Sequence, residues 1–120
     1  MKRPREDPVT NNLVVVIEAR IGEQTLNNFW KIHYVRSFSS LEFETLQSRQ
    51  PGTIICPLIF GRYDAIDVGL LVSRLPKKPR LLVKPPHLPR PFMVLSELRA
   101  ACPLVHIEFL ADQLGKPAYH

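Results

Sequence analysis

The sequence is poor in cysteine and has no long apolar run. Cys56 and Cys102 are its only cysteines, and two are too few for the disulfide framework of a small secreted domain. No stretch approaches the roughly 18 apolar residues of a membrane-spanning helix. The apolar run from Leu13 is broken by Glu18 and Arg20, unlike the core of a signal peptide. We therefore expect a cytoplasmic protein without a membrane partner, in which both thiols are reduced, buried core residues.

Motifs that bind cofactors, metals or nucleotides are also missing. The stretch EARIGEQ, which follows the first apolar run, has a single glycine, and no G-x-G-x-x-G, P-loop or G-x-S-x-G pattern occurs. The four histidines are scattered without the spacing of metal ligands, at His33, His87, His106 and His120. We expect no cofactor and no metal, and interpret His106 as a core or sheet-edge residue.

What the sequence does contain is an alternation of strand-like and helix-like stretches. Five apolar stretches, several of them β-branched, predict strands at residues 12–19, 34–39, 53–56, 79–84 and 104–110. Four stretches with helical spacing lie between them, at residues 21–33, 41–50, 65–75 and 92–102. Asp64 is placed to cap the third helix. Ser39 or Ser40 can cap the second, with Glu42 at the capping-box spacing from Ser39.

This alternation predicts an α/β fold with a parallel sheet and right-handed crossovers. Five strands in 120 residues favour a flavodoxin-like three-layer sandwich with strand order 2-1-3-4-5. We expect one domain over residues 12–110, preceded by a flexible segment, 1–11. Residues 111–120 form a tail in which the last helix is short or missing, because Gly115 and Pro117 interrupt it.

Proline and positive charge are concentrated in one region. Six of the 12 prolines lie within residues 76–91, together with five lysines and arginines, in a chain of net charge +5. This segment predicts a stiff, extended connection. It could dock into an aromatic groove or contact phosphates, although it has no aromatic residue to stack on bases. A rigid connection with solvated charges is the more ordinary interpretation.

The stretch IICPLIFGRYDAIDVGLLVSRL, residues 54–75, together with the order and spacing of the predicted elements over residues 12–110, resembles the receiver domain of two-component response regulators. The resemblance places Asp64 and Ala65 where receivers carry an Asp-Gly pair. It places Pro57 where the phosphoacceptor aspartate belongs. Ile17 and Glu18 stand where receivers have two adjacent acids that hold Mg²⁺.

Two further strand ends depart from the receiver pattern. Lys84 ends the fourth strand in place of Ser or Thr, and Glu108 and Phe109 stand in place of a Lys-Pro pair. Proline cannot be a phosphoryl acceptor, and one carboxylate is a poor Mg²⁺ site. The resemblance therefore implies a degenerate phosphoacceptor pocket of Ile17, Glu18, Pro57 and Lys84, with no catalysis. Glu18 and Lys84 either pair across this pocket or are separately solvated.

The expected function is that of a receiver-like module that acts through protein contacts. The fourth helix and fifth strand form a surface that receivers commonly use, and its candidates here are Phe92, Met93, Leu95, Ile107 and Phe109. We expect protein partners, including a second copy of the chain in a homodimer. One alternative is a small flavodoxin-like enzyme that uses Cys56 as nucleophile. The other is a nucleic-acid-associated regulatory domain, a less favoured partner suggested by the sequence pI near 9.6.

Overall fold

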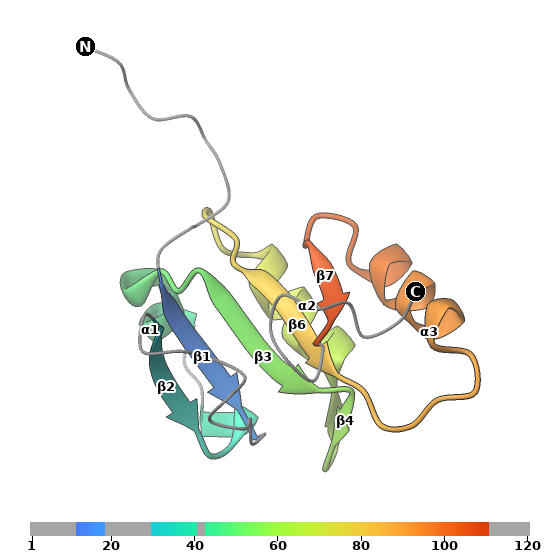
Figure 1. Cartoon of the computed structure of the whole chain (residues 1–120). Coiled ribbons are helices and arrows are strands. Elements are labelled where there is room, and N and C mark those ends of the chain that lie inside the picture. Colours follow the sequence, from blue (N-terminus) through green and yellow to red (C-terminus); the bar gives the residue numbers. More distant parts are fainter. Residues whose placement is uncertain (1–11, 19–29, 41–42, 111–120) are drawn as a thin grey trace.

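The computed structural model describes residues 12–18, 30–40 and 43–110, which contain a five-stranded parallel sheet (Figure 1). The strands are β1 (Leu13–Ile17), β2 (Lys31–Val35), β3 (Thr53–Pro57), β6 (Arg80–Lys84) and β7 (Ile107–Phe109). Their order across the sheet is β2-β1-β3-β6-β7, and every neighbouring pair is parallel. This is the predicted 2-1-3-4-5 order, so the flavodoxin-like fold class is confirmed.

Alternation along the central strands gives the sheet two apolar faces. On one face Val15, Ile54 and Leu81 belong to the main core cluster, and on the other Val14, Ile55 and Leu82 form a second cluster. Successive side chains of a strand point to opposite faces. Burial on both faces requires nearly continuous apolar sequence, which is why LVVVI, TIIC and LLV predict strands so clearly.

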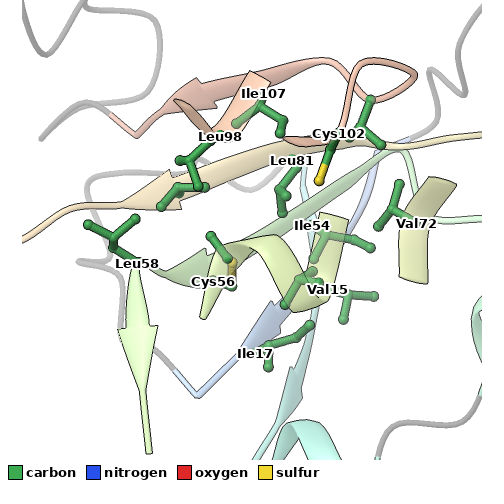
Figure 2. Close-up of a cluster of buried hydrophobic side chains, with 14 of the residues drawn as sticks. Val15, Ile17, Ile54, Cys56, Leu58, Val72, Leu81, Leu98, Cys102 and Ile107 are labelled. Atoms are coloured by element: carbon green, nitrogen blue, oxygen red, sulfur yellow. The ribbon is translucent and has the colours of Figure 1, made fainter. Parts of the chain in front are cut away.

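Three helices and one short 3₁₀ helix accompany the sheet. They are η1 (Phe38–Ser40), α1 (Phe43–Arg49), α2 (Ala65–Ser73) and α3 (Pro91–Ala101). Buried residues of all three α-helices, such as Leu46, Val72 and Leu98, belong to the main core cluster, so these helices cover the same face. Figure 2 shows Val72, Leu98 and Cys102 converging on Ile54 and Leu81 of the sheet.

Sequence signals at the helix ends explain where α2 and α3 begin. The Asp64 side chain accepts hydrogen bonds from the backbone N–H groups of Ile66 and Asp67, as the predicted cap requires. Pro91 opens α3 at a position where its missing N–H costs nothing and its fixed φ suits the helix. The predicted positions of both helices are confirmed to within two residues.

The first half of the chain contains a misplaced boundary. The helix expected over residues 21–33 cannot extend to His33, because Lys31, Ile32 and His33 belong to β2 and pair with β1. The strand expected over 34–39 consequently ends at Val35, and Phe38 begins η1. Trp30 and His33 match a helical spacing, but this spacing was outweighed by pairing with the apolar run of β1.

A small antiparallel hairpin was not predicted. It consists of β4 (Ile59–Phe60) and β5 (Tyr63–Asp64), which follow β3 and lead into α2. Gly61, at the turn, has a φ of 63°, a left-handed conformation that glycine adopts without strain. Two-residue strands are too short to show any periodicity, so the sequence pattern indicated only a loop.

Several predictions lie wholly or partly outside the described residues. They are the flexible segment 1–11, the part of the first helix at 21–29, the capping residue Glu42, and the tail 111–120 with its short or missing helix. No helix of the described part of the chain is long and apolar enough to cross a membrane.

Candidate functional site

The carboxyl ends of the parallel strands meet at one edge of the sheet, which is where folds of this kind place ligands. The residues of the predicted pocket lie at or next to this carboxyl edge. Ile17 ends β1 and is fully buried, and Glu18 follows it in the chain. Pro57 ends β3 and lies in register with Lys84, the last residue of β6. The structure therefore brings Pro57 and Lys84 together on neighbouring strands.

Glu18, which follows β1, is hydrogen-bonded to the end of β2 and to the start of η1. Its backbone N–H donates to the carbonyl of Val35 over 2.9 Å. Its carboxylate oxygen Oε2 accepts from the backbone N–H of Phe38 over 2.7 Å, at the start of η1. Glu18 also has a φ of 48°, uncommon for a residue with a side chain. The carboxylate is therefore turned toward η1 and satisfies one of its free N–H groups.

The distance between Glu18 and Lys84 bears on the predicted ion pair. Because β3 lies between β1 and β6, the two strand ends are separated by two interstrand spacings, about 10 Å. The carboxylate of Glu18 already accepts a hydrogen bond from the N–H of Phe38. The pair stays a prediction, and the geometry gives Glu18 a structural role of its own.

Asp64 and Asp67 form a reciprocal capping box at the start of α2. Asp64 Oδ1 accepts from the N–H groups of Ile66 and Asp67 at 3.0 and 3.1 Å. Asp67 Oδ2 in turn accepts from the N–H of Asp64 at 2.9 Å. Each carboxylate thus satisfies backbone donors that the helix leaves free. Sequence analysis identified Asp64 as the cap but did not identify Asp67 as its partner.

The β4–β5 hairpin is tied to the carboxyl edge by hydrogen bonds and by aromatic contacts. The N–H of Leu58 donates to the carbonyl of Lys84 over 3.1 Å, and the N–H of Ala65 donates to that of Leu58 over 2.9 Å. Phe38 packs against the rings of Phe60 and Tyr63, with centroid separations of 5.9 and 4.9 Å. These edge-to-face contacts fix the hairpin against η1.

The aromatic cluster of Phe38, Phe60 and Tyr63 was missed by sequence analysis. Ile59 and Phe60 before Gly61 and Arg62, with Tyr63 after them, are a weak hairpin signal, which could have suggested the turn. Phe38 lies 22 residues before Phe60 in the sequence, and no local pattern connects them. Only the fold brings η1 and the hairpin together.

Cys56 lies one residue before Pro57 and is fully buried in the main core cluster (Figure 2). Burial raises the pKa of its thiol far above the ordinary value, and the nearby Asp64 carboxylate raises this pKa further. The second thiol, Cys102, is also buried and free. The prediction that both cysteines are buried core residues is confirmed.

The predicted interaction surface divides into exposed and buried residues. Phe92 and Met93, in the first turn of α3, are each 53% exposed. Leu95 and Ile107 are buried in the chain's own core, and Phe109 is half-buried against it. Only Phe92 and Met93 therefore present much of their surface to a partner. Their neighbour Arg90 lies 3.6 Å from Met93, between Nη1 and Sδ.

His106 lies directly before the edge strand β7. Its Nε2 is 2.9 Å from Oε2 of Glu108, and both side chains are more than half exposed. Its location fits the sheet-edge interpretation. Among the described residues, no group of three or more His, Cys, Asp or Glu side chains is arranged to hold a metal ion.

Comparisons with known proteins do not place the chain in a family. No protein-family model, curated protein or solved structure matches it significantly. The order of its strands nevertheless defines the class: it is an α/β protein with a flavodoxin-like parallel sheet.

Proposed function

We propose that the chain is a non-catalytic, receiver-like module of signal transduction that accepts no phosphoryl group on aspartate and acts through protein contacts. The observation that supports this proposal most is that the carboxyl edge has no phosphoryl acceptor at the end of β3 and that its described carboxylates are hydrogen-bonded to backbone N–H groups. Strand β3 ends in Pro57, whose side chain has no oxygen that could accept a phosphoryl group. The nearby carboxylates of Glu18 and Asp64 accept hydrogen bonds from backbone N–H groups. Withdrawing them to bind Mg²⁺ would leave those N–H groups without their partners.

The burial of Cys56 weighs against the alternative of an enzyme. A cysteine nucleophile reacts as a thiolate and is found where the pKa of the thiol is lowered and the sulfur is accessible. Cys56 has no exposed surface, and the pKa of its thiol is raised. A function through contacts with other proteins is therefore the better supported proposal. Two buried, free thiols suit a reducing compartment such as the cytoplasm.

The surface proposed for protein contacts is the exposed part of α3, centred on Phe92 and Met93. Both side chains are large, apolar and half exposed, so a partner that covers them would remove apolar surface from water, which favours binding. A two-fold dimer would place the same patch on both subunits. Because α3 packs next to β7, the last strand of the sheet, such a dimer would form at this side of the molecule.

Sedimentation of the unmodified chain tests this proposal, and we expect a dimer at micromolar concentration. The variant Met93→Glu should raise the dissociation constant of the dimer by tenfold or more, about 1.4 kcal/mol or more, because an unpaired carboxylate would be buried in the apolar contact. Met93 is exposed, so the fold should tolerate the change.

Ile59→Glu is the matched control for this experiment. Ile59 is 70% exposed on the hairpin, remote in sequence from α3, and the substitution makes the same apolar-to-acidic change. It should leave the dimer unaffected. A single monomeric species at every accessible concentration of the unmodified chain would rule out the homodimer, and a protein of different sequence would then be the required partner.

A further inference from the structure

Basic residues are gathered at the amino edge of the sheet, the edge at which the strands begin. We define the basic edge as the residues at strand starts and in the segments leading into them: Lys31, Arg49, Arg74, Lys77, Lys78 and Arg80. Four of these six come from one short stretch, residues 74–80, between α2 and β6. Figure 1 shows this stretch, in yellow, projecting beyond the strand starts.

Most of the described carboxylates lie away from the basic edge. The exception is Glu108, the second residue of β7, whose carboxylate lies 2.9 Å from His106, directly before the start of that strand. Glu18, Asp64 and Asp67 are at the carboxyl edge or just beyond it, and the remaining ones are Glu44 in the first turn of α1, Glu97 within α3 and Glu108 within β7. Within the described residues, no segment that leads into a strand start contains an acidic residue. The two ends of the sheet therefore differ in charge, and the positive field is concentrated at one of them.

Three cations of the basic edge are positioned by neutral groups. Lys78 Nζ donates to the carbonyl of Leu75 over 2.8 Å. Arg80 Nη2 donates to Oγ1 of Thr53 over 3.3 Å. These bonds use one donor of each side chain and leave its charge in place.

Arg74 is the third of these cations. Its guanidinium lies over the ring of Phe43, with Cζ 4.8 Å from the ring centroid. A cation–π contact holds the guanidinium in place without neutralising it. The basic edge thus combines fixed position with retained charge, which lowers the ordering cost of binding an anion.

The dimensions of the basic edge suit an extended polyanion. Lys31 and Arg80 begin strands that are three positions apart in the sheet, a span of about 14 Å. Duplex DNA carries one negative charge per about 1.7 Å of its axis, so this span corresponds to about eight phosphate charges. The planar guanidinium groups of the arginines can each donate two parallel hydrogen bonds to phosphate oxygens.

The composition of this surface argues against a protein or a membrane as its partner. Protein interfaces need an apolar, aromatic-rich centre, and surface binding to a membrane needs an apolar face as well as charge. Most of the exposed large apolar residues of the described chain lie away from the basic edge, on the hairpin, the helices and at Tyr34 of β2. The two nearest to strand starts are Ile32, which follows Lys31, and Leu104, in the loop before β7.

We propose that the basic edge binds the phosphodiester backbone of nucleic acid, without reading its sequence. The proposal goes beyond the receiver-like function and does not rest on it, because it concerns the opposite end of the sheet. Its chemistry is the same for DNA and RNA. The basic edge offers cations to phosphates, whereas the described aromatic residues nearest to it, Trp30 and Phe43, are half-buried and pack against the core clusters.

Fluorescence anisotropy with the full chain tests this proposal, using labelled double-stranded DNA and double-stranded RNA of equal length and mixed sequence. We expect micromolar dissociation constants that are alike for different sequences and rise steeply with salt. If four or five phosphates are contacted, the slope of log affinity against log salt should be about −4. Binding of either nucleic acid in this manner supports the proposal.

Two double variants with the same change of charge locate the site. Arg49→Gln with Lys77→Gln removes two exposed cations of the basic edge. This variant should weaken binding about tenfold or more and reduce the salt slope by about 2. Arg36→Gln with Arg62→Gln removes two exposed cations that follow β2 and lie in the hairpin turn, at the carboxyl edge. This control should change affinity less than threefold.

Several results would overturn the proposal. Equal losses for the two double variants would show that only net charge matters, and an affinity independent of salt would exclude phosphate contacts. Tighter binding of poly-glutamate, at equal charge and salt, would assign the basic edge to an acidic protein. Tighter binding of phosphatidylserine vesicles would assign it to a membrane surface. Circular dichroism of each variant establishes that the fold is retained.

Discussion

At the scale of single residues, the core is packed so closely that small changes have large effects. Gly69 of α2 lies against Cys102, and a Cβ built at Gly69 would be 2.6 Å from Cys102 Sγ. This distance is well below van der Waals contact. Cys102 Sγ also contacts the carbonyl of Ile66 at 3.9 Å. The glycine is therefore required by the close approach of α2 to Cys102, the residue that follows α3.

Gly69→Ala should destabilise the chain by about 1–3 kcal/mol in the free energy of unfolding, because the added methyl group overpacks the core. In an exposed helical position the same change would stabilise. Urea denaturation measures the effect. Combined with Cys102→Ala, which removes the sulfur, Gly69→Ala should cost much less than it does alone. An equally large loss in both backgrounds would show that the contact with Cys102 is not the cause.

Cys56 should react slowly with a small alkylating reagent in the folded chain. Burial and the Asp64 carboxylate raise the pKa of its thiol, so the thiolate stays scarce as pH rises through the value of about 9 at which an unfolded cysteine ionises. Because Cys56 ionises at lower pH in the unfolded chain than in the folded chain, its contribution to the free energy of unfolding decreases as pH rises above about 9. Labelling is followed by mass spectrometry, in Cys102→Ala to isolate the site. Labelling as fast as that of a free thiol would revive the enzyme alternative.

At the scale of secondary structure elements, the parts predicted from sequence are those with strong local signals. The strands β1, β3 and β6 contain continuous apolar runs. Recognisable start signals mark α2, which Asp64 caps, and α3, which begins at Pro91. The boundary of β2 was missed because KIHYV is mixed in polarity and its strand conformation depends on pairing with β1. The hairpin was missed because contacts with Phe38 hold it in place.

The capping box of α2 offers a test at this scale. Asp64→Ala should lower the free energy of unfolding by about 1–2 kcal/mol, because the N–H groups of Ile66 and Asp67 lose their acceptor. Asp67→Ala should cost less, since it frees only the N–H of Asp64. Thermal denaturation measures both, with Glu97→Ala on the exposed side of α3 as a control expected to change stability by less than about 0.5 kcal/mol.

The double variant Asp64→Ala with Asp67→Ala shows whether the two carboxylates act together. Because the two residues form a reciprocal pair, the double variant should lose less stability than the sum of the two single losses. Simple additivity would contradict the capping box as the source of the effect.

At the scale of the whole molecule, the two ends of the sheet have different properties. At the carboxyl edge, the carboxylates of Glu18 and Asp64 accept hydrogen bonds from backbone N–H groups, and β3 ends in proline. At the amino edge, cations are held by neutral partners. The sequence predicted that Glu18, Pro57 and Lys84 lie at the carboxyl edge, because parallel strands all end at the same edge of a sheet. It could not predict the hydrogen bonds of Glu18 and Asp67, which depend on backbone conformation at η1 and α2.

We propose that this flavodoxin-like fold is a receiver-like module without phosphoryl chemistry. The most direct test is the intact mass of the chain after incubation with acetyl phosphate and Mg²⁺, with an active receiver domain treated in parallel. The account predicts an unchanged mass, because Pro57 ends β3 and the Glu18 carboxylate is bonded to the N–H of Phe38. A stoichiometric gain of one phosphoryl group would contradict it.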